Sequence, residues 1–186
     1  MKSKVFIISG PSGAGEDSVL EGLTEKMDFI RPITTTTRKM RDGEFQGSPY
    51  YFISKEAFRN RISTGDFFEW AEQDGGNLYG VTKEELERVR NTGKPVMLKL
   101  DYQGVITIKK LIPESIALLI NVSNDIIEKR LRSRDGDVSD EFIQGRLEHA
   151  KGWRENKDIF DYNIENVEGK LNETIEKTLE IINSNL

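Results

Sequence analysis

The sequence predicts an α/β fold in which helices flank a parallel sheet. Short apolar runs alternate with longer amphipathic stretches along the 186 residues, which is typical of strands that alternate with helices. Runs such as Ile116–Ile120 are continuously apolar, as strands covered by helices on both faces usually are. A glycine-rich loop, Gly10–Ser18, joins the first apolar run to the first amphipathic stretch. The chain length fits one domain.

Four apolar segments predict the strands of the core sheet, and seven amphipathic segments predict helices. The core strands are expected at Val5–Ser9, Pro95–Asp101, Ile116–Val122 and Tyr162–Ile164. The helices are expected at Asp17–Met27, Lys55–Thr64, Lys83–Asn91, Gln103–Leu111, Asp125–Arg134, Glu141–Asp158 and Lys170–Ile182. Thr82 and Glu85 indicate a capping box in which each side chain bonds a free amide at the start of the third helix.

Residues 31–79 differ in texture from the rest of the chain and predict a small mixed lobe inserted in the core. β-Branched and aromatic residues dominate Ile33–Thr37, Tyr50–Ile53 and Phe67–Glu72. Turn-forming residues cluster at Arg41–Gly43 and at Asp74–Asn77.

Composition excludes several kinds of function. The chain has no cysteine, so disulfides, thiolate metal sites and a thiol nucleophile are excluded. The net charge of -5 argues against non-specific binding to nucleic acid, which needs a surplus of basic residues. The apolar run near the amino terminus is about five residues, too short for a signal peptide or a membrane span. We therefore expect a cytoplasmic protein with small-molecule partners and no nucleic-acid or membrane partner.

The loop from Gly10 to Ser18 is arranged to hold phosphate. Because it follows a strand and opens a helix, its backbone amides and the helix dipole converge on one spot that favours an anion. The glycine spacing matches the P-loop pattern of Gly, four residues, Gly, Lys and Ser or Thr, but positions 16 and 17 are Glu16 and Asp17. The alternative interpretation is a glycine-rich turn whose two acids stabilise the start of the helix.

Glu16 changes the energetics of such a loop, because lysine attracts the β and γ phosphates whereas a carboxylate repels them. Two unit charges about 4 Å apart interact by about 4 kcal/mol at an effective dielectric near 20, on the order of a thousandfold in rate or affinity. A side chain that swings out to solvent would leave only the lost attraction. Asp17 offers a carboxylate that suits Mg²⁺, and Ser18 offers a hydroxyl one residue later.

Further segments follow the loop in a characteristic order. They are Thr34–Glu44, Gly47–Phe52, Gly65–Ala71, Asn77–Gly80 and Leu100–Gly104. Together with the loop they resemble the guanylate kinase family over nearly the whole chain. The resemblance implies a P-loop fold of the nucleoside-monophosphate-kinase type, and ATP-dependent phosphorylation of GMP to GDP with Mg²⁺ as cofactor. It divides the chain into a core at residues 1–30, 82–129 and 147–186, a GMP-binding lobe at 31–81 and a helical lid at 130–146.

The resemblance also implies which residues bind GMP. They are Thr34, Arg38, Arg41, Tyr50, Glu69, Tyr79, Thr82 and Asp101. Chemistry supports this for three of them: Arg38 and Arg41 are spaced to form a fork around a phosphate, and Glu69 suits the two donors that guanine presents at N1 and N2. The alternatives are solvated arginines, a surface glutamate and tyrosines that only pack the lobe.

For ATP, the resemblance implies three groups of residues. Those expected at the ATP phosphates and nearby are Gly10, Ser12, Gly13, Ala14, Gly15, Glu16, Asp17, Ser18, Arg130 and Asn166. Mg²⁺ would be held by Asp17, Ser18 and Asp101, and the catalytic arginines would be Arg38, Arg134 and Arg146. The alternatives are a helix cap at Asp101 and solvated basic helix faces. His149 has no partner pattern and is expected on a helix surface.

Lys99 is a second departure from the family pattern, because it stands on the same strand face as Asp101 where the family usually has an acid. One hypothesis is that Lys99 partly compensates for Glu16 as an exchanged ion pair, and the opposite one is a site no longer used for catalysis. Two other functions therefore stay open. One is a weakly active domain that binds GMP or another phospho-ligand. The other is a kinase for ribose bisphosphate, because Gly15–Ser18 resembles the Gly-Lys-Asp-Ser of such kinases. A monomer and a homodimer are both compatible with the sequence.

Overall fold

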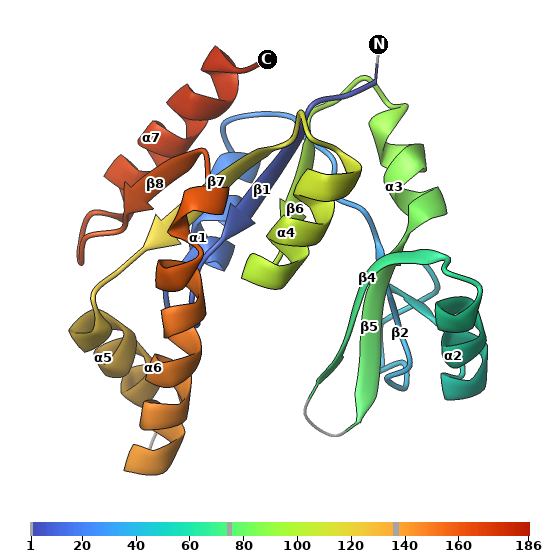
Figure 1. Cartoon of the computed structure of the whole chain (residues 1–186), viewed down its shortest axis with the longest axis horizontal. Coiled ribbons are helices and arrows are strands. Elements are labelled where there is room, and N and C mark those ends of the chain that lie inside the picture. The colour runs from blue at the N-terminus through green and yellow to red at the C-terminus, as the bar shows by residue number, and fades with distance from the viewer. Residues whose placement is uncertain (1, 74–75, 136–137) are drawn as a thin grey trace. The chain divides into compact units, whose positions relative to one another are not determined.

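The computed structural model describes residues 2–73, 76–135 and 138–186, without the side chains of residues 73, 134 and 135. The chain forms two compact units (Figure 1). The smaller unit comprises Met1–Ser3 and Ile30–Val96, and the larger unit comprises Lys4–Phe29 and Met97–Leu186.

The larger unit is built on a four-stranded sheet in the order β6-β1-β7-β8. Its strands are β1 (Val5–Ser9), β6 (Val96–Lys99), β7 (Ile116–Asn121) and β8 (Tyr162–Glu165). β1 runs parallel to β7, and β7 runs parallel to β8. All five residues of β1 are buried, as its apolar run predicts. The predicted parallel core sheet is confirmed.

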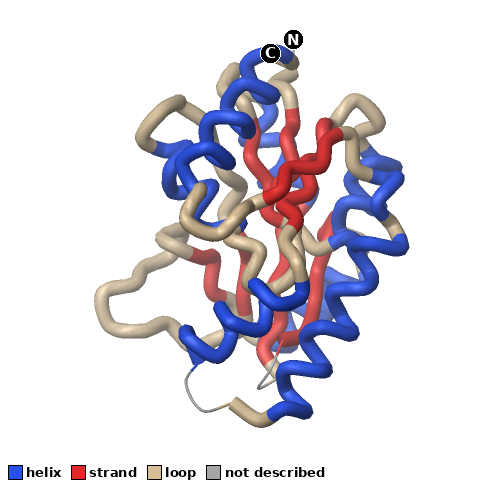
Figure 2. Tube along the Cα trace, turned by 90° about the vertical axis from the view of Figure 1, so that its left-hand side faces the viewer, coloured by secondary structure: helices blue, strands red, loops and turns tan. Residues whose placement is uncertain are grey.

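Helices lie against the strands of this sheet (Figure 2). They are α1 (Glu16–Thr24), α4 (Tyr102–Leu111), α5 (Asn124–Asp135), α6 (Asp140–Glu155) and α7 (Leu171–Ser184), with a short 3-10 helix η1 (Lys157–Ile159). Phe6 and Ile8 of β1 belong to one apolar cluster with residues of α1, α5, α6 and α7. Because a fully buried large apolar side chain stabilises a fold by about 1.5–3 kcal/mol, this cluster is the main source of the unit's stability.

The smaller unit is a mixed sheet in the order β3-β2-β5-β4 with two helices. Its elements are β2 (Thr34–Thr36), β3 (Tyr50–Phe52), α2 (Lys55–Ser63), β4 (Phe67–Gln73), β5 (Asn77–Thr82) and α3 (Lys83–Arg90). β2 runs parallel to β3, whereas β5 is antiparallel to both β2 and β4. A separate small core holds Phe58, Phe67 and Leu78, and the two phenylalanine rings stack at 4.2 Å between centroids. The predicted mixed lobe is confirmed, because its sheet contains both parallel and antiparallel strand pairs.

One strand of this unit was not expected from the sequence. β5 begins at Asn77, which we assigned to a turn, and it runs through Gly80. A glycine weakens the strand signal, but a Cβ on Gly80 would lie 2.7 Å from the Glu69 carbonyl oxygen, so close strand packing requires glycine there. Residues 74 and 75 of the same predicted turn lie outside the described residues.

One local prediction is wrong, and another is confirmed only in part. The first helix ends at Thr24 rather than at Met27, because the N–H groups of both Lys26 and Met27 turn back to the Leu23 carbonyl. The capping box of α3 forms only in part: the Thr82 hydroxyl accepts from the Glu85 N–H at 3.1 Å, but the Glu85 carboxylate binds the Arg88 guanidinium and the Ile33 N–H instead. A guanidinium forms two bonds with a carboxylate, which outweighs a single bond to the cap amide.

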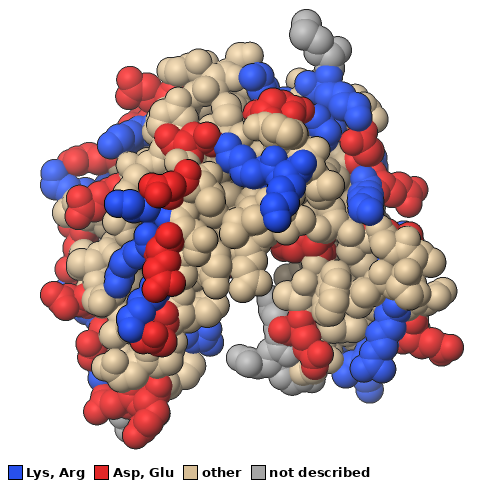
Figure 3. Space-filling view, viewed as in Figure 1, with Lys and Arg blue, Asp and Glu red and all other residues tan. Residues whose placement is uncertain are grey.

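Among the helices of the described ranges, none combines the length and the apolar character needed to cross a bilayer. Figure 3 shows acidic and basic side chains interspersed over the helices of the larger unit.

Candidate functional site

The predicted phosphate loop lies between β1 and α1, as the sequence indicates. Gly13 and Gly15 have φ angles of 87° and 98°, which favour glycine, and Gly15 is the residue that precedes α1. The Ala14 N–H donates to the Pro11 carbonyl at 2.8 Å and closes the turn. A Cβ on Gly10 would lie 2.6 Å from the Ile120 carbonyl oxygen, so the loop begins tight against β7. The glycine spacing is therefore a requirement of the loop's shape.

Two side chains from elsewhere in the larger unit hold the carbonyl groups of this loop. The Arg130 guanidinium on α5 donates to the Gly13 and Ala14 carbonyls at 2.8 and 3.1 Å. The buried Asn166, just after β8, donates to the Ala14 carbonyl at 2.7 Å and accepts from the Thr174 hydroxyl at 3.1 Å. With these carbonyls bound, the loop is braced for its amides to receive an anion. We did not predict Thr174, because nothing in its surrounding sequence distinguishes it from an ordinary residue of α7.

A pocket of about 450 Å³ opens beside the braced loop. It is lined by Gly13, Gly15, Glu16, Asp17, Ser18, Arg130, Asn166, Val167, Gly169 and Leu171. The structure therefore brings together seven of the residues predicted at the ATP phosphates. The lining combines backbone groups, two carboxylates, a guanidinium and an amide with the apolar side chains of Val167 and Leu171. Such a mixture of polar and apolar groups is usual for a small-molecule site.

Glu16 is turned toward the loop and is only partly exposed. Its carboxyl carbon lies 3.3 Å from the place where a Cβ on Gly10 would stand. Burial raises the pKa of Glu16 from 4.5 to about 7, against the opposing effects of its own N–H, of the Lys99 charge and of the Gly15 backbone. The side chain therefore does not swing out to solvent, and a carboxyl group occupies the neighbourhood that the P-loop pattern gives to a cation.

Lys99 reaches the start of α1 from the end of β6. Its Nζ lies 2.7 Å from Oδ1 and 2.9 Å from Oδ2 of Asp17. One of our two hypotheses was an ion pair between Lys99 and Glu16; the hydrogen bonds go to Asp17 instead, and the Lys99 charge lowers the pKa of Glu16. One acid of the first turn thus binds the ammonium, and the other experiences its charge.

The predicted magnesium ligands all offer oxygen atoms, but two of them already have other partners. Asp17 is 78% exposed and paired with Lys99, and Ser18 is exposed. Asp101 caps α4, because its Oδ1 accepts from the Gly104 N–H at 2.8 Å. In the described part of the chain, no group of three or more acidic or histidine side chains is placed to hold a metal ion. These residues therefore fit Mg²⁺ only together with oxygens of a bound phosphate, which is how Mg²⁺ commonly binds in kinases.

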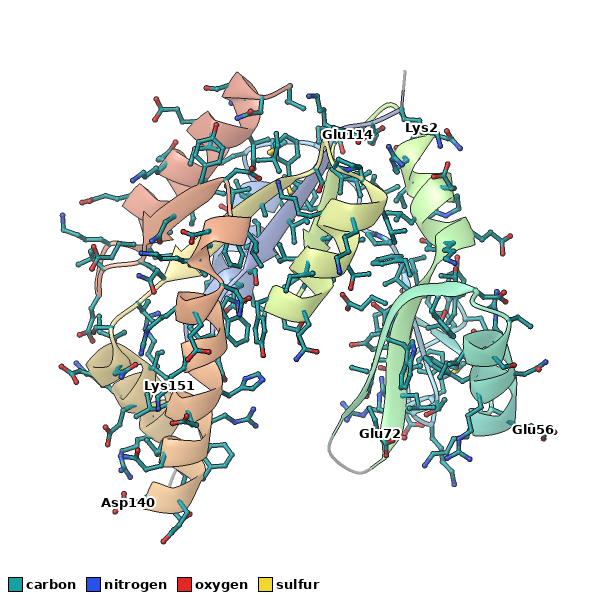
Figure 4. All side chains as sticks on the ribbon, in the orientation of Figure 1. Lys2, Glu56, Glu72, Glu114, Asp140 and Lys151 are labelled. Atoms are coloured by element: carbon teal, nitrogen blue, oxygen red, sulfur yellow. The ribbon has the colours of Figure 1, made fainter. Side chains whose placement is uncertain are left out.

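Residues 130–146, predicted to form the lid, include the end of α5 and the start of α6. Arg146 lies with its Cζ 5.0 Å from the Phe142 ring. Arg132 on α5 pairs with Glu128 at 2.9 Å and with Asp140 at 2.5 Å, at the amino end of α6 (Figure 4). The side chain of Arg134, predicted to be catalytic, lies outside the described residues.

An aromatic anchor that we did not predict joins α6 to the strand before the loop. The buried Trp153 donates through Nε1 to the Ser9 hydroxyl at 2.8 Å. Its ring meets those of Tyr102 and His149 edge to face, with centroids 5.2 and 5.3 Å away. His149 is exposed on α6, as expected. A tryptophan near the end of an amphipathic helix was the available signal for this anchor.

In the smaller unit, three of the residues predicted to bind GMP lie together. The Arg38 guanidinium lies 5.4 Å from the Tyr50 ring centroid, and the Tyr50 and Tyr79 rings meet at 6.0 Å. Glu44 holds this arrangement, since it binds Arg38 Nη2 at 2.7 Å and the Arg41 N–H at 2.7 Å. Contact with Glu44 is the main reason that the pKa of Arg38 is raised. We did not assign Glu44 a role, although its place after the Arg41–Gly43 turn was a signal.

The other residues of this unit that were predicted to bind GMP are Thr34, Glu69, Arg41 and Thr82. Thr34 stands opposite Tyr50 in the β2–β3 register, and Glu69 lies partly buried on β4. Arg41 is exposed. Thr82 is buried, and its hydroxyl caps α3. The unit thus holds a tyrosine-lined cluster whose central arginine is already paired with a carboxylate.

The parallel sheet, the braced glycine loop before α1 and the separate mixed-sheet unit define a P-loop protein of the nucleoside-monophosphate-kinase type. The family model for guanylate kinase matches residues 2–185, and the chain belongs to that family. It is 39% identical over 147 residues to a guanylate kinase of Fusobacterium nucleatum, covering 78% of each chain. It is 34% identical over 184 residues to a guanylate kinase of Clostridium tetani, covering 98% of this chain and 86% of that one. The crystal structure of guanylate kinase from Anaplasma phagocytophilum has the same fold, with a TM-score of 0.67 at 24% identity over 98% of this chain and 86% of that chain.

Proposed function

We propose that this protein transfers the terminal phosphoryl group of ATP to GMP and releases GDP and ADP. The observation that carries the proposal is the family match, which spans residues of both units. The braced phosphate loop and the Arg38–tyrosine cluster agree with it. Both substrates are small molecules, and we place the reaction in the cytoplasm, within purine nucleotide metabolism.

GMP would bind through charge and through the edge of its base. Arg38 and Arg41 would hold the phosphate, with hydroxyl groups of Tyr50 and Tyr79 beside it. Because Glu44 already binds Arg38, the phosphate would compete with a carboxylate that keeps the guanidinium in place. Glu69 would accept hydrogen bonds from guanine N1 and N2, with the Thr34 hydroxyl nearby.

Thr82 and Asp101 would contribute to GMP binding only through groups that their capping bonds do not use. For Thr82 this is the hydroxyl hydrogen, and for Asp101 it is the second carboxylate oxygen. Their contribution to affinity is therefore expected to be smaller than that of Arg38.

ATP would bind with its phosphates on the loop amides. Arg130 and Asn166 would keep the loop in the conformation that presents these amides, through their bonds to the loop carbonyls. Arg38, Arg134 and Arg146 would stabilise charge during transfer, the latter two as arginines do on lids that close over ATP. Mg²⁺, held by Asp17, Ser18 and Asp101 together with phosphate oxygens, would neutralise part of the developing charge.

The chemistry needs no covalent intermediate. The bond between the γ-phosphorus and the bridging oxygen of ATP breaks, ADP leaves with the electron pair, and a GMP phosphate oxygen forms the new bond to phosphorus. Positioning and electrostatic stabilisation carry such reactions. Glu16 opposes both, because its charge repels the phosphates when it is ionised. We expect Glu16 to slow the transfer without changing the identity of the acceptor.

A steady-state assay of ATP turnover with GMP tests this function. Turnover with GMP and none with ribose bisphosphates supports it, and Glu16→Lys is expected to raise the rate, with the full charge effect of about a thousandfold as the upper bound. A chain that turns over ribose bisphosphate but not GMP would contradict the proposal.

A second function, that of a weakly active GMP-binding domain, would rest on the partly buried Glu16 in the loop, whereas the relatives of this chain favour the kinase. Titration calorimetry separates the two: GMP binding without any GDP formed, in both the unaltered chain and Glu16→Lys, indicates a binding domain.

A further inference from the structure

The order of the strands brings Lys99 to the phosphate loop. β6 lies next to β1, and the Leu100 N–H donates to the Ile8 carbonyl at 3.3 Å, so these two strands end together. The three residues of β6 before Lys99 are buried, whereas the Lys99 side chain is 38% exposed. β6 therefore delivers an ammonium group to the mouth of the loop that follows β1.

The Lys99 ammonium is held at the first turn of α1 before any nucleotide binds. Both oxygens of Asp17 lie within 2.9 Å of its Nζ. Its charge also reaches Glu16, the residue at the P-loop lysine position. A lysine ammonium has three N–H donors, and the bonds to Asp17 use two of them, which leaves one for an anion in the loop.

Stability of the fold does not account for this placement. The Asp17 side chain is 78% exposed, and exposed ion pairs typically contribute only about 0–1 kcal/mol. A cation at the amino end of a helix also opposes the helix dipole, whereas the two acids alone suit it. The ammonium does suit an anion bound to the loop amides. There it supplies the positive charge that a lysine at position 16 would give and that Glu16 does not.

We propose that Lys99 supplies, from the end of β6, the ammonium that contacts the β and γ phosphates of the donor nucleotide, in place of the missing loop lysine. The inference rests on the proposed function for the identity of the donor. Lys99 is then a catalytic residue that acts by charge alone: it forms no bond to phosphorus and gives up no proton. Asp17 keeps the ammonium at the loop until the phosphates arrive.

The test compares Lys99→Ala in two backgrounds, the unaltered chain and Glu16→Lys. The matched control is Lys26→Ala, at the other end of α1. Lys26 is equally exposed, at 38%, and is paired at 2.8 Å with Glu176 of α7, whereas Lys99 is paired with Asp17 in the first turn of α1. Thermal unfolding confirms that each variant folds. The readouts are kcat/KM for ATP at saturating GMP, and the affinity for β,γ-imido-ATP with Mg²⁺ by calorimetry.

The expected result is a loss that depends on the background. In the unaltered chain, Lys99→Ala lowers kcat/KM for ATP and affinity for β,γ-imido-ATP by about tenfold or more, and Lys26→Ala changes neither beyond about twofold. In the Glu16→Lys background the restored lysine makes Lys99 redundant, so Lys99→Ala costs less than about threefold there. An equal loss in both backgrounds, or no loss in the unaltered chain, overturns the inference.

The binding readout keeps this inference apart from the proposed function. If GMP is not phosphorylated but β,γ-imido-ATP binds and loses affinity on Lys99→Ala, the acceptor is wrong and the role of Lys99 is supported. If GMP is phosphorylated and Lys99→Ala leaves both readouts unchanged, the function stands and the role of Lys99 is refuted. A chain that does not bind β,γ-imido-ATP at all overturns the inference.

Discussion

Replacing Glu16 by glutamine is expected to remove a pH dependence of stability that the buried carboxyl group creates. Because the pKa of Glu16 is raised from 4.5 to about 7, the folded chain holds a proton there that the unfolded chain releases. The associated stability is fully present below pH 4.5 and is lost as the pH rises toward and through 7. At about 1.4 kcal/mol per pKa unit, the full loss is about 3.5 kcal/mol. Between pH 5 and pH 8 it is about 2.5 kcal/mol, since the unfolded chain is already partly ionised at pH 5.

Urea denaturation at pH 5 and pH 8, without nucleotide or Mg²⁺, measures this effect. The free energy of unfolding of Glu16→Gln, relative to the unaltered chain, should rise by about 2.5 kcal/mol from the lower to the higher pH. Glu21→Gln is the matched control, because it removes an exposed carboxylate from the same helix. A pH-dependent difference below about 0.5 kcal/mol for Glu16→Gln, or one equal to the control, would refute the reasoning that burial of Glu16 governs its ionisation.

Three further substitutions test other contacts. Asn166→Ala removes the bonds to the Ala14 carbonyl and the Thr174 hydroxyl, and should lower the free energy of unfolding by about 1–3 kcal/mol and weaken ADP binding in calorimetry; unchanged ADP affinity would argue against a braced loop. Trp153→Phe keeps a ring but loses the bond to Ser9, and should cost about 1 kcal/mol in urea denaturation, whereas equal stability would show that the bond contributes nothing. Arg38→Lys should lower kcat/KM for GMP by about tenfold or more and leave KM for ATP nearly unchanged, because an ammonium lacks the guanidinium fork; an equal effect on both substrates would contradict a role in GMP binding.

Much of the fold could be predicted because its signals are local. The apolar run of β1 and the glycines after it specify a strand, a tight turn and a helix start within about fifteen residues of sequence. The cap of α3 by Thr82 is likewise written in four neighbouring residues. β5 could not be predicted from such signals, because the need for Gly80 comes from Glu69 on a neighbouring strand.

The candidate site was predictable in its residue types but not in its contacts. Asn166 stands 152 residues from Ala14 in sequence, so no local pattern shows that it holds the loop carbonyl. Whether Lys99 bonds Glu16 or Asp17 depends on the direction in which each side chain leaves the first turn of α1, which two adjacent acids in a sequence do not reveal. The sequence shows an acid at position 16 and a lysine at position 99, and the structure shows that Asp17 is the partner of that lysine.

The account depends most directly on the identity of the phosphoryl acceptor. Incubation of the unaltered chain and of Glu16→Lys with ATP, Mg²⁺ and GMP, followed by chromatographic separation of the nucleotides, measures that acceptor. We predict that GDP and ADP form in equal amounts with both proteins, and faster with Glu16→Lys. Failure of both proteins to form GDP, while they remain folded and bind ATP, would contradict the claim that this chain is a GMP kinase.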